Sequence, residues 1–86
     1  MAYVKKNQMC YVCLVCEDDR VYCAGVSLHA YGVLNYTAGV EQDLREKGYE
    51  LEDLRDNWRY GESYVSYWSK GEHEVTVIIQ KSALAQ

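Results

Sequence analysis

The N-terminal third of the chain carries two apolar segments separated by a polar turn. Met9–Cys16 and Arg20–Leu28 are rich in Val, Tyr, Leu and Cys, residue types that favour strands. Asp18 and Asp19 lie between them and suit a tight turn, because Asp side chains hydrogen-bond the backbone of their own turn. This pattern predicts a β-hairpin.

A second pair of strand-like segments lies near the C-terminal end. Tyr60–Ser69 and His73–Lys81 flank Gly71, and glycine readily adopts the positive φ that tight turns often require. From Val75 to Ile79, every other residue is a β-branched apolar one. These features predict a second hairpin.

Between the hairpins the hydrophobic period changes from two to between three and four. A helical stripe is formed by Val33, Tyr36, Val40 and Leu44. Gly48 follows where a helix commonly ends. The same spacing continues at Leu51, Leu54 and Trp58 and predicts a second short helix.

These elements predict a single α+β domain spanning residues 1–86. We expect a four-stranded antiparallel sheet from the two hairpins, with one or two short helices between them in the order ββ-α(α)-ββ. The alternating residues of Met9–Cys16 are apolar on both faces of that strand. An antiparallel sheet with helix on one side usually has a polar second face. The second face therefore needs a cover, either from loops and the N-terminal segment or from another protein.

The charge balance is acidic, with a formal net charge of −4. The nine Lys and Arg residues are spread along the chain and form no cluster for a phosphate backbone, so we expect no direct nucleic-acid binding. The acidic residues concentrate at Glu41, Asp43, Glu46, Glu50, Glu52, Asp53 and Asp56. They form either a solvated helical face or a surface for a basic partner.

No targeting or membrane segment is expected. The apolar run Met9–Cys16 is eight residues long, whereas a membrane-spanning helix needs about 20. It is also not followed by the small-residue cleavage site of a signal peptide. We therefore expect a cytoplasmic protein with reduced cysteines and no membrane partner.

The cysteine spacing Cys10-x2-Cys13-x2-Cys16-x6-Cys23 is the one constellation that suggests metal chemistry, since four thiolates can bind zinc. Residues three apart in a strand point to opposite faces, which separates Cys13 from Cys10 and Cys16. We expect buried reduced thiols that pack as small apolar side chains, with no metal and no cofactor. A zinc-binding module is the alternative.

Disulfides are not expected within the first hairpin. A turn centred on Asp18 and Asp19 places Cys16 opposite Val21 and Cys23 opposite Leu14, so no two cysteines face each other. A slipped register, or a bulge near Ala24 and Gly25, would change that pairing.

Tyr11-Val12-Cys13, followed by Val21-Tyr22-Cys23-Ala24-Gly25, resembles the paired-tyrosine hairpin of the GIY-YIG nucleases. The resemblance implies a small α/β nuclease that cuts nucleic acid with a divalent metal. The chain departs from that family's pattern, because Ala24 precedes the Gly and no Arg follows where the family's helix begins. A degenerate nuclease of this type is a further alternative.

The function that the composition favours is binding without catalysis. We expect a protein-binding module, of the kind encoded by phages or plasmids to inhibit a host enzyme or defence complex. Aromatic contact area would come from Tyr60, Tyr64, Tyr67 and Trp68. Attraction to a basic protein surface would come from Glu41, Asp43, Glu46, Glu52, Asp53 and Asp56. The second sheet face would also suit a homodimer.

Overall fold

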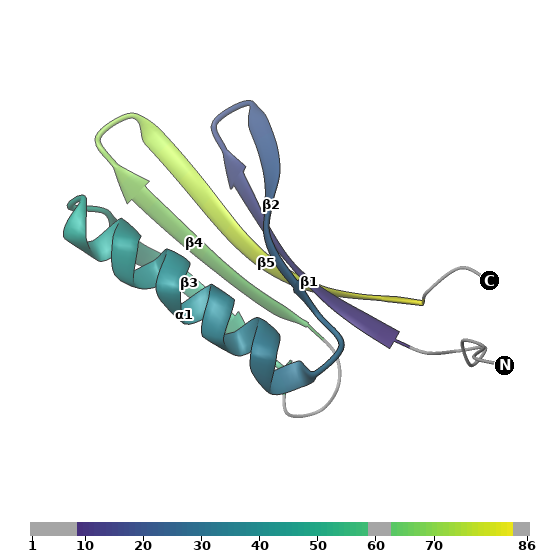
Figure 1. Cartoon of the computed structure of the whole chain (residues 1–86). Coiled ribbons are helices and arrows are strands. Elements are labelled where there is room, and N and C mark those ends of the chain that lie inside the picture. Colours follow the sequence, from purple (N-terminus) through teal and green to yellow (C-terminus); the bar gives the residue numbers. More distant parts are fainter. Residues whose placement is uncertain (1–8, 59–62, 84–86) are drawn as a thin grey trace, which may run out of the picture.

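A five-stranded antiparallel sheet carries one helix on one face (Figure 1). The computed structural model describes residues 9–58 and 63–83. The elements in chain order are β1 (Met9–Glu17), β2 (Arg20–Ser27), α1 (Ala30–Glu46), β3 (Glu50–Asp56), β4 (Tyr64–Lys70) and β5 (His73–Ala83). The strand order β2-β1-β5-β4-β3 places β1 and β5 at the centre. The predicted α+β class is confirmed.

Both predicted hairpins are present, and pairing of β1 with β5 joins them. Cys16 pairs with Val21 and Leu14 with Cys23, as the turn position predicts. The register then shifts, because Cys13 pairs with Gly25 and leaves Ala24 as the bulged residue. The bulge brings no two cysteines opposite each other, and all four are free thiols.

The prediction of a second helix around Leu51 and Leu54 is wrong, because this segment forms β3, the fifth strand. Its register shifts between Leu51 and Asp53, so that Glu52 is an extra residue. Leu51 pairs with Trp68 and Leu54 with Ser66, two positions on one face of β4. The bulge thus lets a three-residue spacing, which is typical of a helix, place both leucines on the same side of a strand.

The helical stripe before β3 is confirmed. Val33 and Leu44 of α1 are buried against the sheet, and the helix ends at Glu46, two residues before the predicted glycine. Gly48 has a φ of 92° and its N–H donates to Arg45 O at 3.0 Å, while Tyr49 N–H donates to Leu44 O at 2.9 Å. This pair of bonds satisfies the last free carbonyls and needs the left-handed conformation at Gly48.

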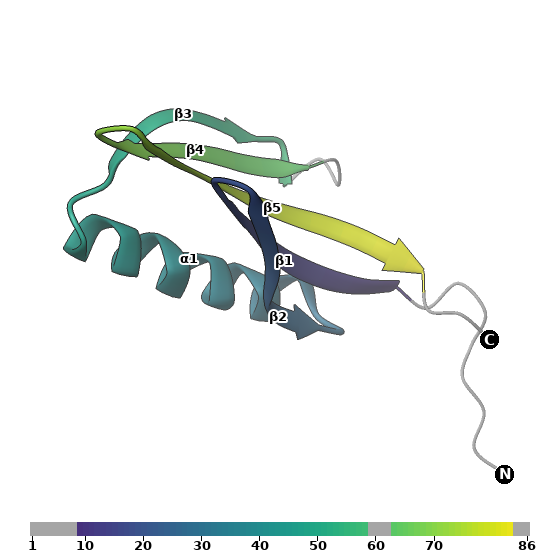
Figure 2. The same cartoon turned by 90° about the horizontal axis from the view of Figure 1, so that it is seen from above.

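The core lies between α1 and the central strands, and Figure 2 shows the helix along one side of the twisted sheet. It is formed mainly by short side chains: Cys13, Val15, Val33, Val75, Val77 and Ile79. Thr37 is buried among them and donates to Val33 O at 2.9 Å, which satisfies its hydroxyl without water.

The helix approaches β2 closely at Gly25. A Cβ atom at this position would lie 2.5 Å from Cγ of Tyr36, a helix residue whose ring rests on the glycine. Cγ is fixed to the helix backbone by one side-chain torsion, so the ring has little room to withdraw. Gly25 therefore sets the distance between α1 and the β2 edge of the sheet.

We expect Gly25→Ala to destabilise the fold by about 1–3 kcal/mol, the usual cost of overpacking. In a Tyr36→Ala background the same substitution is expected to cost much less, because the ring that it meets is gone. Urea unfolding of the wild type, both single variants and the double variant measures this coupling. Equal costs of Gly25→Ala in the two backgrounds would contradict the close approach.

The tips of the two hairpins are joined by Asp18. Its backbone N–H donates to Glu74 O at 3.0 Å, and its carboxylate accepts from Glu74 N–H at 3.2 Å and contacts His73 Nδ1 at 3.2 Å. These contacts lower the pKa of the Asp18 carboxyl below its ordinary value. The hydrogen bond with the Glu74 backbone has the largest effect, and the contact with the His73 side chain has the next largest. The ionised carboxylate therefore favours the folded state.

For Asp18→Asn we expect lower stability near neutral pH and a smaller deficit in acid. The contribution of Asp18 is complete above the ordinary pKa of 3.8 and is lost as the pH falls through the lower folded value. Asn also tolerates the positive φ of 52° found here. Urea midpoints from about pH 6 to about pH 2.5 measure the difference. Asp19→Asn removes the same charge from the same turn and is the control; a deficit that stays constant with pH would be inconsistent with this role.

Candidate functional site

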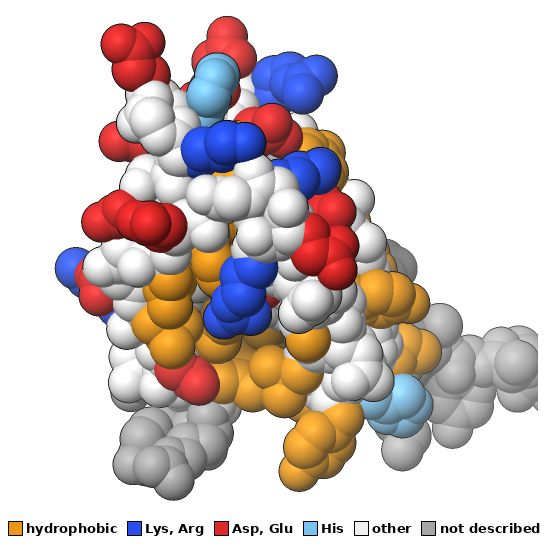
Figure 3. Space-filling model, turned by 90° about the vertical axis from the view of Figure 1, so that its left-hand side faces the viewer, with side chains coloured by type: hydrophobic (Ala, Val, Ile, Leu, Met, Phe, Trp, Pro, Cys, Tyr) orange, Lys and Arg blue, Asp and Glu red, His pale blue; other side chains and the backbone are white. Residues whose placement is uncertain are grey.

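One half of the helix-bearing face is incompletely covered. The helix packs mainly on β2, β1 and β5, which leaves Leu51 and Leu54 of β3 42% and 46% exposed. Viewed from the β3 edge, hydrophobic side chains gather between the strand side on the left and the helix side on the right, with a basic side chain among them (Figure 3). We call this surface the α1–β3 groove and define it by Tyr31, Leu34, Leu51, Leu54, Asp56 and Trp58.

At one end of the groove lies a pocket of about 580 Å³, between the first turns of α1 and the end of β3. Its described lining consists of Ala30, Tyr31, Leu34, Asp56 and Trp58. Asp56 Oδ1 accepts a hydrogen bond from Trp58 N–H at 3.1 Å, which fixes the turn after β3. The Trp58 ring meets Tyr11 edge-on, with 5.5 Å between ring centroids, and Lys81 Nζ lies 5.7 Å from its centre. The pocket therefore combines apolar and aromatic walls with one carboxylate.

A hydrogen-bonded network attaches the helix to β4 behind the groove. Glu41 Oε2 accepts from Tyr64 OH at 2.6 Å and from Ser66 Oγ at 2.7 Å, and Trp68 Nε1 donates to Ser66 Oγ at 2.8 Å. One turn further along the helix, the guanidinium of Arg45 lies 5.0 Å from the centre of the Trp68 ring. Ser66 is completely buried, so its hydroxyl is held by structural contacts and does not face solvent.

Burial raises the pKa of the Tyr64 hydroxyl, and the hydrogen bond to the Glu41 carboxylate raises it further. Both effects have the same origin, because a second negative charge beside Glu41 in a partly desolvated site is unfavourable. Tyr64 therefore stays protonated and keeps donating to Glu41 far into the alkaline range.

The aromatic residues predicted to contact a partner do not form one surface. Trp68 and Tyr64 are only 2% and 9% exposed, beneath the helix, and are part of the core. Tyr67 is 36% exposed on the opposite face of the sheet. Tyr60 lies outside the described residues. Tyr64 and Trp68 therefore offer no contact area to a partner.

The acidic residues also divide between two elements, which corrects the interpretation of a single helical face. Glu41, Asp43 and Glu46 belong to α1, whereas Glu52, Asp53 and Asp56 belong to β3. Asp43 forms an exposed ion pair with Lys47 at 2.9 Å, and Glu52 accepts a hydrogen bond from Ser69 Oγ. Of the β3 carboxylates, Asp56 shares the groove side with Leu51 and Leu54, because it pairs with Tyr64.

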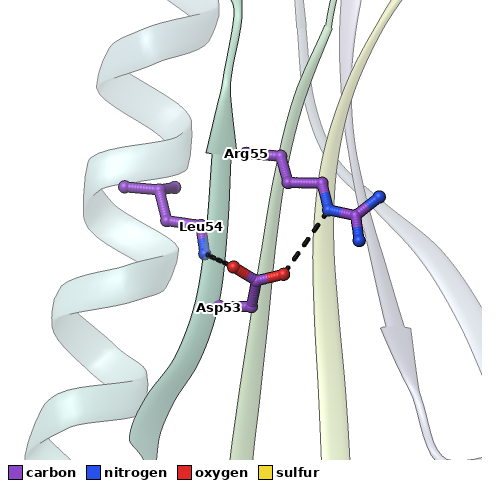
Figure 4. A network of polar contacts seen from close by, with 3 residues as sticks. All are labelled: Asp53, Leu54 and Arg55. Atoms are coloured by element: carbon purple, nitrogen blue, oxygen red, sulfur yellow. Dashed lines mark hydrogen bonds and ion pairs between the residues drawn. The ribbon is translucent and has the colours of Figure 1, made fainter.

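Asp53 protects the outer edge of β3. Its carboxylate accepts from Leu54 N–H at 2.9 Å and from Arg55 Nε at 3.4 Å (Figure 4). The Leu54 side chain points to the helix, while Arg55 points away from it (Figure 4). A backbone N–H at a sheet edge is thereby satisfied within the chain, which hinders the addition of another strand.

The cysteines lie on both faces of the first hairpin. Cys13 is completely buried beneath α1, and burial raises the pKa of its thiol. Cys10 and Cys16 belong to the opposite face of β1. Within residues 9–58 and 63–83, no three His, Cys, Asp or Glu side chains converge as a metal site requires.

The two tyrosines of the nuclease-like hairpin lie apart. Tyr11 pairs with Ser27 and packs on Trp58, whereas Tyr22 pairs with Val15, four residues along β1 and about 13 Å away. Comparisons with protein-family models, with curated proteins and with solved structures found no match. In the described part of the chain, no helix has the length and apolar character needed to cross a bilayer.

Sequence reasoning missed the groove residues on β3. Leu51 and Leu54 have the spacing of a helix, and no feature of the sequence marks the bulge at Glu52 that gives them a common face. The exposed Tyr31 and the half-buried Leu34 lie in the first turns of α1 and are not members of the stripe that the periodicity identifies. The one available signal is Asp56, an acidic residue two positions before Trp58.

We expect Tyr64→Phe to reduce stability at neutral pH by about 1 kcal/mol, the usual value of one hydrogen bond. The deficit is expected to shrink above about pH 10, because the unfolded wild type can then ionise Tyr64 whereas the folded state cannot. Denaturant unfolding from about pH 8 to about pH 11 measures both effects. Tyr67→Phe, on the other face of the same strand, controls for loss of one tyrosine; identical alkaline profiles for the two variants would refute the assignment.

Proposed function

We propose that this chain is a non-enzymatic binding module that holds a segment of another protein in the α1–β3 groove. The observation that carries the proposal is the row formed by Leu51, Leu54 and Asp56 on one side of an edge strand. It leaves two leucines about half exposed and leads into the pocket beside Trp58. Exposed apolar side chains in a concave surface are typical of docking sites.

The groove defines the chemistry of its partner. Its walls are mainly apolar, with one basic side chain among them (Figure 3), and the described lining of the pocket itself contains one acidic side chain, that of Asp56, and no basic one. A partner segment with apolar residues and one Lys or Arg fits this arrangement, because a cation can meet the carboxylate while its aliphatic stem lies on the aromatic walls. The net charge of −4 favours approach of such a basic segment.

The segment is proposed to lie on the face of β3 and not to extend the sheet. Asp53 already satisfies Leu54 N–H at the edge, and the strand carries charged residues along its length. Side chains that enter the groove therefore provide the affinity, as in recognition by pockets. That docking inhibits a host enzyme or defence complex stays a prediction, and it is decided by assaying the partner once it is identified.

Affinity purification from the native host identifies the partner, and calorimetry with the purified partner then tests the groove. We expect Leu54→Lys to weaken binding by about 100-fold, because it places a charge among apolar contacts and repels a basic segment. Asp56→Asn is expected to weaken it by about 10-fold and to reduce its salt dependence. Circular dichroism confirms that both variants are folded.

Val26→Lys is the matched control, since it adds the same charge at a similarly exposed position on the opposite face of the sheet. Its affinity is expected to stay within about twofold of the wild type. Wild-type affinity of Leu54→Lys, or loss of binding in Val26→Lys alone, would place the docking surface elsewhere and disprove the proposal.

A further inference from the structure

The face of the sheet opposite α1 carries a continuous apolar area and no described element covers it (Figure 2). The pairing register places Leu14 beside Ile78, and Ile78 beside Val65. On the β2 side the area continues to Val21 and Val26, which are 66% and 54% exposed. We call this surface the outer face and define it by Val12, Leu14, Cys16, Val21, Cys23, Val26, Val65, Tyr67, Thr76 and Ile78.

The centre of the outer face is electrically neutral, although the chain is acidic. None of its defining residues is Asp, Glu, Lys or Arg. Charges lie at its margins: Glu74 of β5 pairs with Ser69 near the hairpin tip, and Asp53 and Arg55 on β3 pair with each other at 3.4 Å. Two copies of a chain with a net charge of −4 can therefore meet through the centre of this face without burying like charges there.

The residue types favour a second copy over an unrelated protein. The outer face is mostly aliphatic, with Tyr67 as its single aromatic residue. Interfaces between different proteins concentrate energy in Trp, Tyr and Arg, whereas homodimer interfaces are more apolar and resemble a divided core. Two packed sheets lie about 10 Å apart, and side chains of the size of Val, Leu and Ile fill the space between them.

The size of the face is also adequate for a dimer. The four strands that carry the outer face lie about 4.8 Å apart, and with about seven residues each at about 3.3 Å they give a footprint of about 440 Å². Side chains raise the accessible area above this flat value, towards the about 800 Å² that each partner buries in a standard interface. Sheet-on-sheet contact thus uses the whole face and no other surface.

We propose that two copies of this chain associate through their outer faces into a symmetric β-sandwich dimer. The proposal is independent of the α1–β3 groove, which lies on the other side of the sheet. The dimer leaves both grooves open, so that the assembly presents two docking sites facing in opposite directions.

Sedimentation velocity of the purified full chain, from about 1 μM to about 200 μM, tests the association by mass action. We expect a monomer–dimer equilibrium in the wild type. Val26→Lys and Tyr67→Lys are each expected to weaken it by about 10-fold and the double variant by about 100-fold or more, because a two-fold interface contains every substitution twice. Both positions are exposed in the protomer, and circular dichroism checks that the variants fold.

Leu54→Lys is the matched control, since it adds the same side chain on the groove side and is expected to leave the dimer intact. A wild-type monomer at every concentration overturns the proposal, as does a dimer that tolerates the double variant or is lost in Leu54→Lys. The proposal is also overturned if the wild type is a monomer that binds a different protein and the outer-face variants lose that binding. These results are separable from the test of the groove, which measures partner affinity and not self-association.

Cys23 gives a second readout that requires no substitution. Its thiol lies exposed on the outer face, whereas Cys13 is completely buried beneath α1. Alkylation by iodoacetamide, followed by mass spectrometry, is expected to slow at Cys23 as the protein concentration rises and to stay slow at Cys13 throughout. A Cys23 rate that does not change with concentration in a sample shown to be dimeric would place the interface on another surface.

Discussion

A single helix has to cover a five-stranded sheet, and the remaining features of the surface depend on this constraint. The 17 residues of α1 give a rod about 25 Å long and about 10 Å wide, whereas the sheet is about 24 Å across. The helix therefore protects about half of one face. The remaining half contains the groove, and no helix of the described residues lies on the second face. A small chain with 49% hydrophobic residues thus exposes apolar side chains in two separate places.

Two contacts decide which half of the face is protected. Near β2, the ring of Tyr36 rests on Gly25 and holds the helix close to the sheet. Towards β4, Glu41 accepts two hydrogen bonds across a wider gap that the large side chains of Tyr64 and Trp68 fill. The helix is consequently close to the sheet on one side and held away by ring-bearing side chains on the other. The groove is the geometric result of this difference.

The sequence was sufficient to predict the two hairpins, the register next to the first turn and the end of the helix at Gly48, because each depends on local chemistry. It was insufficient for β3, where Leu51 and Leu54 have the spacing of a helix and share a face only because the strand bulges at Glu52. The surplus of apolar side chains on the second face could also be recognised from alternation in β1. The burial of Trp68 and Tyr64 could not be recognised from the sequence, because it depends on where α1 crosses β4. Periodicity carries no information about such a tertiary contact.

The central position of β1 and β5 has a consequence for how the sheet is assembled. These strands come from opposite ends of the described chain, and their pairing joins Met9 to Ala83. Each hairpin contains only nearby residues and can form early, whereas the seam between the hairpins has to close a long loop first. During synthesis, one side of β1 therefore stays unpaired until β5 has left the ribosome, even after the N-terminal hairpin and the helix have formed.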